Sequence, residues 1–169
     1  MPLMFGVGIL TVSDRSARGE YEDRSGPLIA QIIGERTPWR VVRQTIVADD
    51  VSAISSELRA WSDLDIQLIL TTGGTGFAPR DVTPEATRLV IEREVPGIPE
   101  ALRAESLKVT QHAMLSRGLA GIRGQTLIVN LPGNPKAVRE NLDVLLPVLP
   151  HALALLTGKS GSEAGHRSA

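Results

Sequence analysis

The chain has 169 residues and a mass of 18.1 kDa, which indicates a single domain. Hydrophobic residues make up 42% and charged residues 22%, so a wholly disordered chain is excluded. The net charge of −1 lacks the basic excess of a polyanion binder, and two Phe, two Trp and one Tyr are too few for a base-stacking surface. We therefore expect no nucleic-acid partner. The absence of cysteine excludes disulfides, thiolate nucleophiles and cysteine-ligated zinc.

No segment has the pattern of a targeting or membrane sequence. The apolar residues 1–10 lack the basic segment and small-residue cleavage site of a signal peptide. The apolar stretch 145–156 contains Pro147 and Pro150 and is shorter than a membrane span of about 20 residues. We expect a cytoplasmic protein without a membrane partner. Residues 1–158 are predicted to form the domain, and the small, polar residues 159–169 a flexible tail.

Segments with strand and helix patterns alternate along the first half of the chain. The apolar run 5–12 predicts a buried strand, and Gly26-Pro27 marks the start of a helix. A strand over 41–47, a helix from Val51 and a strand over 66–72 follow. The last of these strands runs directly into a glycine-rich loop.

The second half of the chain continues the alternation. Thr83-Pro84-Glu85 has the form of a helix start, with Thr as the cap and Pro in the first turn. A helical stretch is predicted over about 99–116, and a strand pair over 121–123 and 126–130. Helices over 135–146 and 151–157 complete the pattern. This order predicts an α/β layered fold with a largely parallel sheet.

Polar or glycine-rich residues follow four of the predicted strands. In open α/β sheets, ligands bind beyond the carboxyl ends of the strands, so we expect these segments to share one cleft. The segments are Ser13-Asp14-Arg15, Asp49-Asp50, Gly73–Gly76 and Asn130–Lys136.

The loop Thr71–Gly76 (TTGGTG) combines backbone freedom with hydroxyl groups, as a loop that wraps a phosphate or a heterocycle requires. It is neither a Walker A loop nor a G-x-G-x-x-G dinucleotide fingerprint. Taken in isolation, such a loop is equally well interpreted as a simple strand-to-helix turn.

Asp49, Asp50 and Asp81 are the candidate metal ligands. Mg²⁺ prefers one or two carboxylates together with substrate phosphates, and these residues offer carboxylates on two loops. One of Asp49 and Asp50 is also a suitable cap for the helix that starts at Val51. Asp81 also fits a solvated loop charge.

Lys136 follows Pro135 in the first turn of a predicted helix, where the helix dipole disfavours a cation by about 0.3–1 kcal/mol. An anion held by Gly133, the helix N-terminus and Lys136 would compensate for this cost. The alternative is an exposed lysine whose ammonium group extends into water.

Five ordered motifs resemble those of the Mog/MoaB-type molybdopterin-binding family, over about residues 7–158. The resemblance implies a three-layer α/β/α fold with a mostly parallel, mixed sheet, a homotrimer, and hand-over of the product to a molybdenum-insertion protein. The motifs are Thr11–Arg15, Thr71–Gly76 with Pro79–Thr87, Glu105–Leu107, Leu115–Arg117 and Leu131–Lys136.

The resemblance also implies that Mg²⁺-ATP and molybdopterin react to give adenylyl-molybdopterin and pyrophosphate. Asp49 and Asp81 match the family's essential aspartates and would hold the Mg²⁺. The glycine loop would hold the pterin with Ser106 and Ser116, and the loop 132–136 would position the phosphate-bearing end. A catalytically silent molybdopterin-binding protein of the same family is the alternative. The substrate-binding residues implied are Ser13, Asp14, Thr72, Gly73, Gly74, Thr75, Gly76, Thr83, Pro84, Ser106, Ser116, Asn130, Pro132, Gly133, Pro135 and Lys136.

Overall fold

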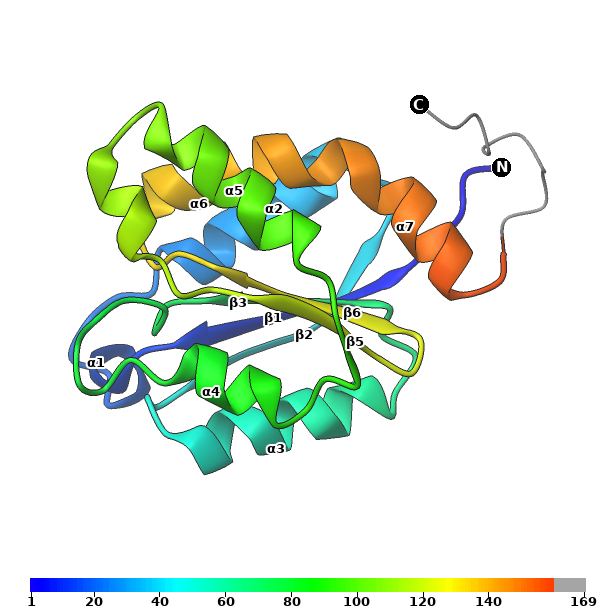
Figure 1. Cartoon of the computed structure of the whole chain (residues 1–169). Helices are drawn as coiled ribbons and strands as arrows, with labels where there is room; N and C mark the ends of the chain where they lie inside the picture. The colour runs from blue at the N-terminus through cyan, green and yellow to red at the C-terminus, as the bar shows by residue number, and fades with distance from the viewer. Residues whose placement is uncertain (160–169) are drawn as a thin grey trace.

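A six-stranded mixed sheet forms the centre of the molecule in the computed structural model, which describes residues 1–159 (Figure 1). The strand order is β2-β1-β3-β6-β5-β4; the first four strands are parallel, and β5 and β4 are antiparallel to their neighbours. The strands are β1 (Gly6–Val12), β2 (Arg40–Val47), β3 (Leu68–Thr72), β4 (Arg93–Glu94), β5 (Ala120–Arg123) and β6 (Thr126–Leu131).

Helices cover both faces of the sheet (Figure 1). On one face lie α2 (Ser25–Arg36), α5 (Gly97–Leu107), α6 (Pro135–Leu145) and α7 (Leu149–Leu156). On the other face lie α3 (Val51–Ser62) and α4 (Thr83–Arg88). The expected three-layer α/β/α fold with a mostly parallel, mixed sheet is thus confirmed. The short helices are α1 (Asp14–Ala17) and the 3₁₀ helices η1 (Gln111–Leu115) and η2 (Leu146–Val148).

The central strands supply both layers of the core. Ile9 and Leu70 belong to the apolar cluster under the larger helical layer, whereas Leu10 and Ile69 belong to the cluster under α3 and α4. All four side chains are fully buried. Since successive strand residues point to opposite faces, a strand covered on both faces needs an unbroken apolar run, as the sequence of β1 has.

One predicted element is wrong in extent. The expected helix over 99–116 divides into α5, which ends at Leu107, and η1, which begins at Gln111. Thr110 between them has extended backbone angles (φ −151°, ψ 140°), and its hydroxyl accepts a hydrogen bond from the His112 N–H at 3.2 Å. This hydroxyl caps the start of η1, and the extended backbone of Thr110 separates η1 from α5. The short α1 and β4 were also not predicted from the sequence.

The other predicted elements are present, with shifted ends. The predicted strand pair is the β5–β6 hairpin, whose turn contains Gly124 at φ +55°. Within residues 1–159, no helix has the length and apolar character that crossing a membrane requires. The tail predicted from Lys159 onward lies, from residue 160, outside the described residues.

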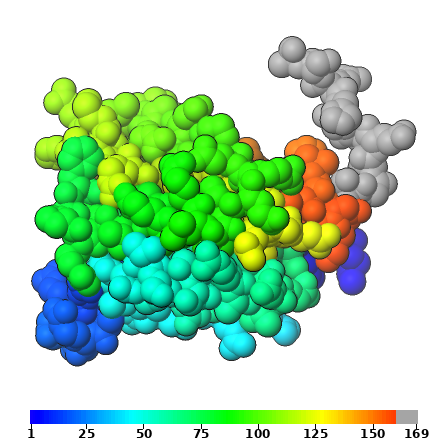
Figure 2. All heavy atoms as spheres, turned by 60° about the horizontal axis from the view of Figure 1, so that its bottom comes forward, coloured from blue at the N-terminus to red at the C-terminus, as the bar shows by residue number. Residues whose placement is uncertain are grey.

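The parallel strands carry their carboxyl-end loops to one end of the sheet, where α1 also lies (Figure 1). Figure 2 shows the face covered by α3, with the green segment that follows the glycine loop beside it and the blue α1 region at one end. The chain therefore brings its polar strand ends together at a single edge.

Candidate active site

The glycine loop leaves β3 through two residues in the left-handed region, Gly73 (φ 96°) and Gly74 (φ 67°). A side chain at Gly73 would overlap the carbonyl oxygen of Val12, and one at Gly74 would overlap the hydroxyl of Thr83. Both positions therefore require glycine for conformation and for space. The loop has a defined shape, beyond that of a generic turn.

Hydrogen bonds tie this loop to its neighbours. The Thr72 hydroxyl donates to the Pro132 carbonyl at 2.7 Å, and the Gly73 N–H donates to the Leu131 carbonyl at 3.3 Å. The Thr83 hydroxyl donates to the Gly73 carbonyl at 2.9 Å. The ends of β3 and β6 and the start of α4 are thus fixed to one another.

Asp49 and Asp50 have different roles. The Asp50 carboxylate accepts a hydrogen bond from the Ala53 N–H at 2.8 Å and caps α3. Asp49 lies before it, half-buried, and its carboxylate accepts from the Asp14 N–H at 2.8 Å. The alternative in which one of the pair caps the helix that starts at Val51 is therefore confirmed for Asp50, and Asp49 remains the candidate metal ligand.

Asp81 approaches the same loop from a tight turn. Its N–H donates to the Ala78 carbonyl at 2.9 Å, and its Oδ2 accepts from the Ala78 N–H at 3.0 Å. A Cβ atom at Gly76 would lie 2.9 Å from Asp81 Oδ2, and one at Gly74 would lie 3.1 Å from Asp49 Oδ1. Carboxylates from two separate loops thus reach glycines two residues apart.

The environment of the site shifts the pKa values of Asp49 and Asp14 in opposite directions. Partial burial raises the pKa of Asp49, and the nearby charges of Asp14 and Asp81 raise it further. The guanidinium of Arg80 binds Asp14 with Nε 2.8 Å and Nη2 3.0 Å from its oxygens, and these hydrogen bonds lower the pKa of Asp14. Among the described residues, Asp49 therefore lacks a cationic partner of its own, which suits a carboxylate that binds a metal ion.

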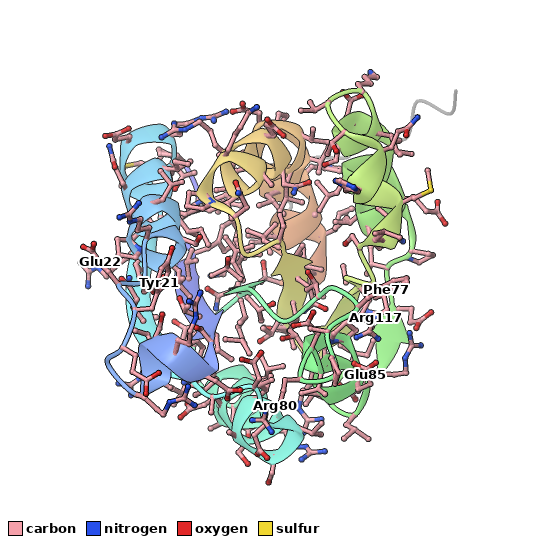
Figure 3. All side chains as sticks on the ribbon, turned by 90° about the vertical axis from the view of Figure 1, so that its left-hand side faces the viewer. Tyr21, Glu22, Phe77, Arg80, Glu85 and Arg117 are labelled. Atoms are coloured by element: carbon pink, nitrogen blue, oxygen red, sulfur yellow. The ribbon has the colours of Figure 1, made fainter. Side chains whose placement is uncertain are left out.

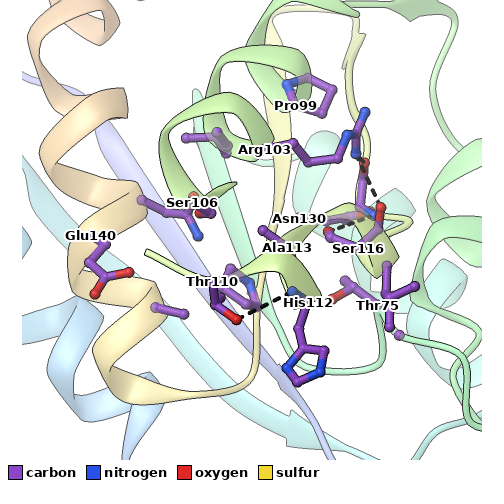
Figure 4. A pocket seen from close by; sticks show the side chains of 17 residues that line it. Thr75, Pro99, Arg103, Ser106, Thr110, His112, Ala113, Ser116, Asn130 and Glu140 are labelled. Carbon is purple, nitrogen blue, oxygen red and sulfur yellow. Dashed lines mark hydrogen bonds between the residues drawn. The ribbon is translucent and has the colours of Figure 1, made fainter. Parts of the chain in front are cut away.

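A cavity of about 280 Å³ opens on one side of the glycine loop, between α5, η1 and α6 (Figure 4). Its wall includes apolar residues and a few polar ones, among them Arg103 and His112. It includes six of the predicted substrate-binding residues: Thr75, Gly76, Ser106, Ser116, Asn130 and Pro132.

A second cavity, of about 290 Å³, lies on the other side of the loop. Arg15 and Arg24 contribute cationic groups to its wall, which also contains Asp23, Tyr21 and several small side chains. It includes five further predicted residues: Ser13, Thr72, Gly73, Gly133 and Pro135. The glycine loop therefore separates two cavities, and Asp49 approaches it at Gly74, between the portions that line each one.

Some predicted binding residues support the site from behind. Thr83 is fully buried and binds the Gly73 and Gly74 carbonyls, so it lies beneath the loop, and Pro84 next to it is also buried. Asn130 is 5% exposed; its amide donates at 3.0 Å to the hydroxyls of Thr71 and Thr87, and its carbonyl accepts from the Leu119 N–H. These groups hold the strand ends in register.

Lys136 has the exposed placement that the alternative interpretation described. Its side chain is 78% exposed, lies outside both cavities and approaches Glu140 at 3.9 Å. The Asn134 side chain accepts hydrogen bonds from the N–H groups of Lys136 and Ala137, at 2.9 Å and 3.3 Å. The backbone donors expected to hold an anion at the start of α6 are thus already engaged.

Two arginines take a part in the site that was not predicted from the sequence. Arg80 binds Asp14, and Arg117 binds the glycine loop, the Asp81 turn and α4. Figure 3 views this end of the molecule and shows the side chains of Arg117 and Glu85 directed toward one another. The only sequence signal for these contacts is that Arg80 lies in the motif Pro79–Thr87 and Arg117 in the motif Leu115–Arg117.

The same motifs and fold occur in known proteins. Residues 8–151 match the family model described as a probable molybdopterin binding domain. The chain belongs to this family. A solved structure titled as the molybdopterin biosynthesis enzyme MoaB from Thermus thermophilus is similar, with 53% identity and a TM-score of 0.86. The alignment covers 91% of this chain and 97% of that structure.

Two curated relatives place the domain in different contexts. Gephyrin of Dictyostelium discoideum is 48% identical over 96% of this chain, which spans only 24% of that longer protein. Molybdopterin adenylyltransferase of Helicobacter pylori (strain J99) is 43% identical over 90% of this chain and 88% of its own length. The same domain thus occurs both as nearly a whole protein and as one part of a larger one.

Proposed function

We propose that the chain is an adenylyltransferase of molybdenum cofactor biosynthesis, which transfers AMP from Mg²⁺-ATP to the terminal phosphate of molybdopterin. The observation that carries this proposal is the approach of the Asp49 and Asp81 carboxylates to one glycine loop with a cavity on each side. A two-substrate transfer needs two adjoining sites and a place where phosphate charge is neutralised. The similarity to the Helicobacter pylori enzyme supports the same assignment.

The chemistry of the two carboxylates fits Mg²⁺. Each uses Oδ2 to accept a backbone hydrogen bond, which leaves Oδ1 to face a cation. No cluster of three or more acidic, His or Cys ligands occurs within residues 1–159, so phosphate oxygens and water would complete the coordination shell. When bound, Mg²⁺ would neutralise the charge that develops on the phosphates.

The residues of the cavities suggest how the substrates divide. The cavity lined by Ser106, Ser116 and the loop residues Thr75 and Gly76 would hold the pterin. The cavity that contains Arg15, Arg24 and Gly133 would hold the phosphate-bearing ends, and the exposed Lys136, next to Pro135 of its wall, supplies a further cation. The phosphate oxygen of molybdopterin would attack the α-phosphorus of ATP while the bond to pyrophosphate breaks. Such a step requires positioning and no protein nucleophile.

The test is pyrophosphate release by the purified chain with Mg²⁺, ATP and molybdopterin. We expect wild-type protein to release pyrophosphate, and D81N to bind molybdopterin and remain folded without transfer, because its amide oxygen can still accept from the Ala78 N–H. Asp63, an exposed residue at the end of α3, provides the control D63N, which should be fully active. Molybdopterin binding without pyrophosphate release in the wild type would instead establish a silent binding protein.

We further propose a cytoplasmic homotrimer whose product passes to a molybdenum-insertion protein. Light scattering on the purified chain should then give about three times the 18.1 kDa chain mass. A monomer mass would contradict the trimer and leave the transfer assay as a separate question.

A further inference from the structure

Arg117 joins three parts of the site that are distant in sequence. Its Nε donates to the Gly76 carbonyl at 2.8 Å, and its Nη2 donates to the Asp81 carbonyl at 2.8 Å. Its Nη1 binds the carboxylate of Glu85 in the first turn of α4. The side chain is 34% exposed, so one guanidinium ties together the glycine loop, the Asp81 turn and α4 from a half-buried position.

The main chain around Arg117 is itself fixed. The Arg117 N–H donates to the Thr75 carbonyl at 2.8 Å. From α5, Arg103 Nη1 donates to the Gly118 carbonyl at 2.9 Å and to that of Ser116 at 3.5 Å (Figure 4). Arg103 therefore fixes the carbonyls of both residues that flank Arg117, and the Arg117 guanidinium points toward the glycine loop.

Arg117 binds backbone atoms that determine where the Asp81 carboxylate points. The Asp81 turn closes through only two hydrogen bonds with Ala78, in a segment where residues 77–80 are exposed. The bond from Arg117 to the Asp81 carbonyl adds a third constraint and connects it to Gly76, the loop residue beside the Asp81 carboxylate. Thr83, two residues after Asp81, also binds the loop, because its N–H donates to the Gly74 carbonyl at 3.1 Å and its hydroxyl to the Gly73 carbonyl. Arg117 is the contact that joins the Asp81 carbonyl itself to Gly76.

We propose that Arg117 is a positioning residue, which holds the Asp81 carboxylate over Gly76 by binding the two backbone carbonyls and Glu85. The inference rests on the proposed transfer reaction for its kinetic consequence, while its structural consequence stands by itself. Arg117 does not line either substrate cavity, so it acts through Asp81 and not by touching a substrate. Lysine cannot replace it, because a single ammonium group lacks the planar fork that reaches three acceptors.

The experiment compares R117K with R88K. Arg88 lies on α4, is exposed, and pairs with Glu94 away from the loop, so R88K should match the wild type. For R117K we expect kcat to fall roughly 10–100-fold, as for a catalytic group displaced by about 1 Å, with KM for molybdopterin changed less than about threefold. In the substrate-free protein, amide exchange at Ala78 and Asp81 should become faster in R117K only.

The outcomes separate this proposal from the proposed function. Unchanged kcat, or unchanged exchange at the Ala78 and Asp81 amides, would overturn the positioning role. If the wild type releases no pyrophosphate, the proposed function fails, and amide exchange still decides whether Arg117 fixes the Asp81 turn. If R117K does not fold, E85Q removes only the charge that Arg117 binds and should give smaller changes in the same direction. No change in kcat or exchange for E85Q would then contradict the proposal.

Discussion

Asp14 and Asp49 each bind the other's backbone. The Asp14 N–H donates to the Asp49 carboxylate at 2.8 Å, and the Asp49 N–H donates to the Asp14 carboxylate at 3.0 Å. This exchange ties the end of β1 to the end of β2, but it also places two negative charges side by side. Arg80 balances one of them by binding Asp14 with two hydrogen bonds.

The first prediction concerns the charge of Asp14. In D14N, the amide oxygen can still accept from the Asp49 N–H, while the negative charge that raises the pKa of Asp49 is removed. Arg80, no longer neutralised by Asp14, also favours ionised Asp49. The pKa of Asp49 should therefore fall. Carbon-13 NMR titration of the Asp49 carboxyl would measure it, with D63N as a control that shows no shift. An unchanged or higher titration midpoint in D14N would contradict this account.

The second prediction concerns stability and pH. Because the pKa of Asp49 is raised above its ordinary value of 3.8, the folded state binds this proton more tightly than the unfolded chain does. The stability that Asp49 contributes therefore declines as pH rises from 3.8 through the raised pKa. Without Mg²⁺, D49N should melt about 1–3 °C above the wild type at pH 7, an effect limited by solvent screening.

Thermal denaturation across pH provides the measurement. The difference in Tm between D49N and the wild type should shrink toward zero below pH 3.8, where both side chains are neutral. Added Mg²⁺ should raise the Tm of the wild type more than that of D49N, because only the wild type keeps both proposed ligands. A difference in Tm that grows toward acid pH would show that the sign is wrong.

The fold could be predicted from the sequence because its strongest signals are local. The unbroken apolar run of β1 reflects burial on both faces, and Pro84 in the first turn marks the start of α4. The predicted cap was wrong: Thr83 is the first residue of α4, and its hydroxyl donates to the Gly73 carbonyl instead of capping the helix. By contrast, Lys108-Val109-Thr110 contains no glycine or proline to mark the end of a helix, so the break between α5 and η1 was not predicted. A threonine hydroxyl that caps a 3₁₀ turn is indistinguishable in sequence from a threonine inside a helix.

Residues of the candidate site could be predicted from the sequence, but the hydrogen bonds between them could not. Composition and motif position singled out Asp49 and Asp81, and both reach the glycine loop. The pattern of residues did not decide which of Asp49 and Asp50 caps α3. Both are aspartates, and only the backbone conformation of the folded chain determines which carboxylate reaches the Ala53 N–H. Arg117 binds Gly76 across 41 residues, and such a pairing depends on tertiary structure that no local pattern encodes.

The third prediction tests the shape of the glycine loop. G74A would place a methyl group against the Thr83 hydroxyl in a backbone region that side chains disfavour, whereas G124A has a positive φ of 55° and open space around it. We expect G124A to lose about 1 kcal/mol of unfolding free energy, and G74A to lose about 2–4 kcal/mol. Urea denaturation would compare them. Equal losses would show that the Thr83 contact adds nothing.

The fourth prediction tests the cavity assigned to the pterin. Ala113 is half-buried on η1 and lines this cavity, so A113W should fill much of its 280 Å³ and block molybdopterin. The Asp49 and Asp81 carboxylates belong to other loops, and Mg²⁺-ATP binding should therefore remain. Calorimetric titration would show molybdopterin affinity reduced at least about tenfold, with ATP affinity unchanged. A101W, on the exposed face of α5, is the matched control and should bind both substrates normally. Normal molybdopterin affinity in A113W would move the pterin site elsewhere, and loss of ATP affinity alone would exchange the two cavities.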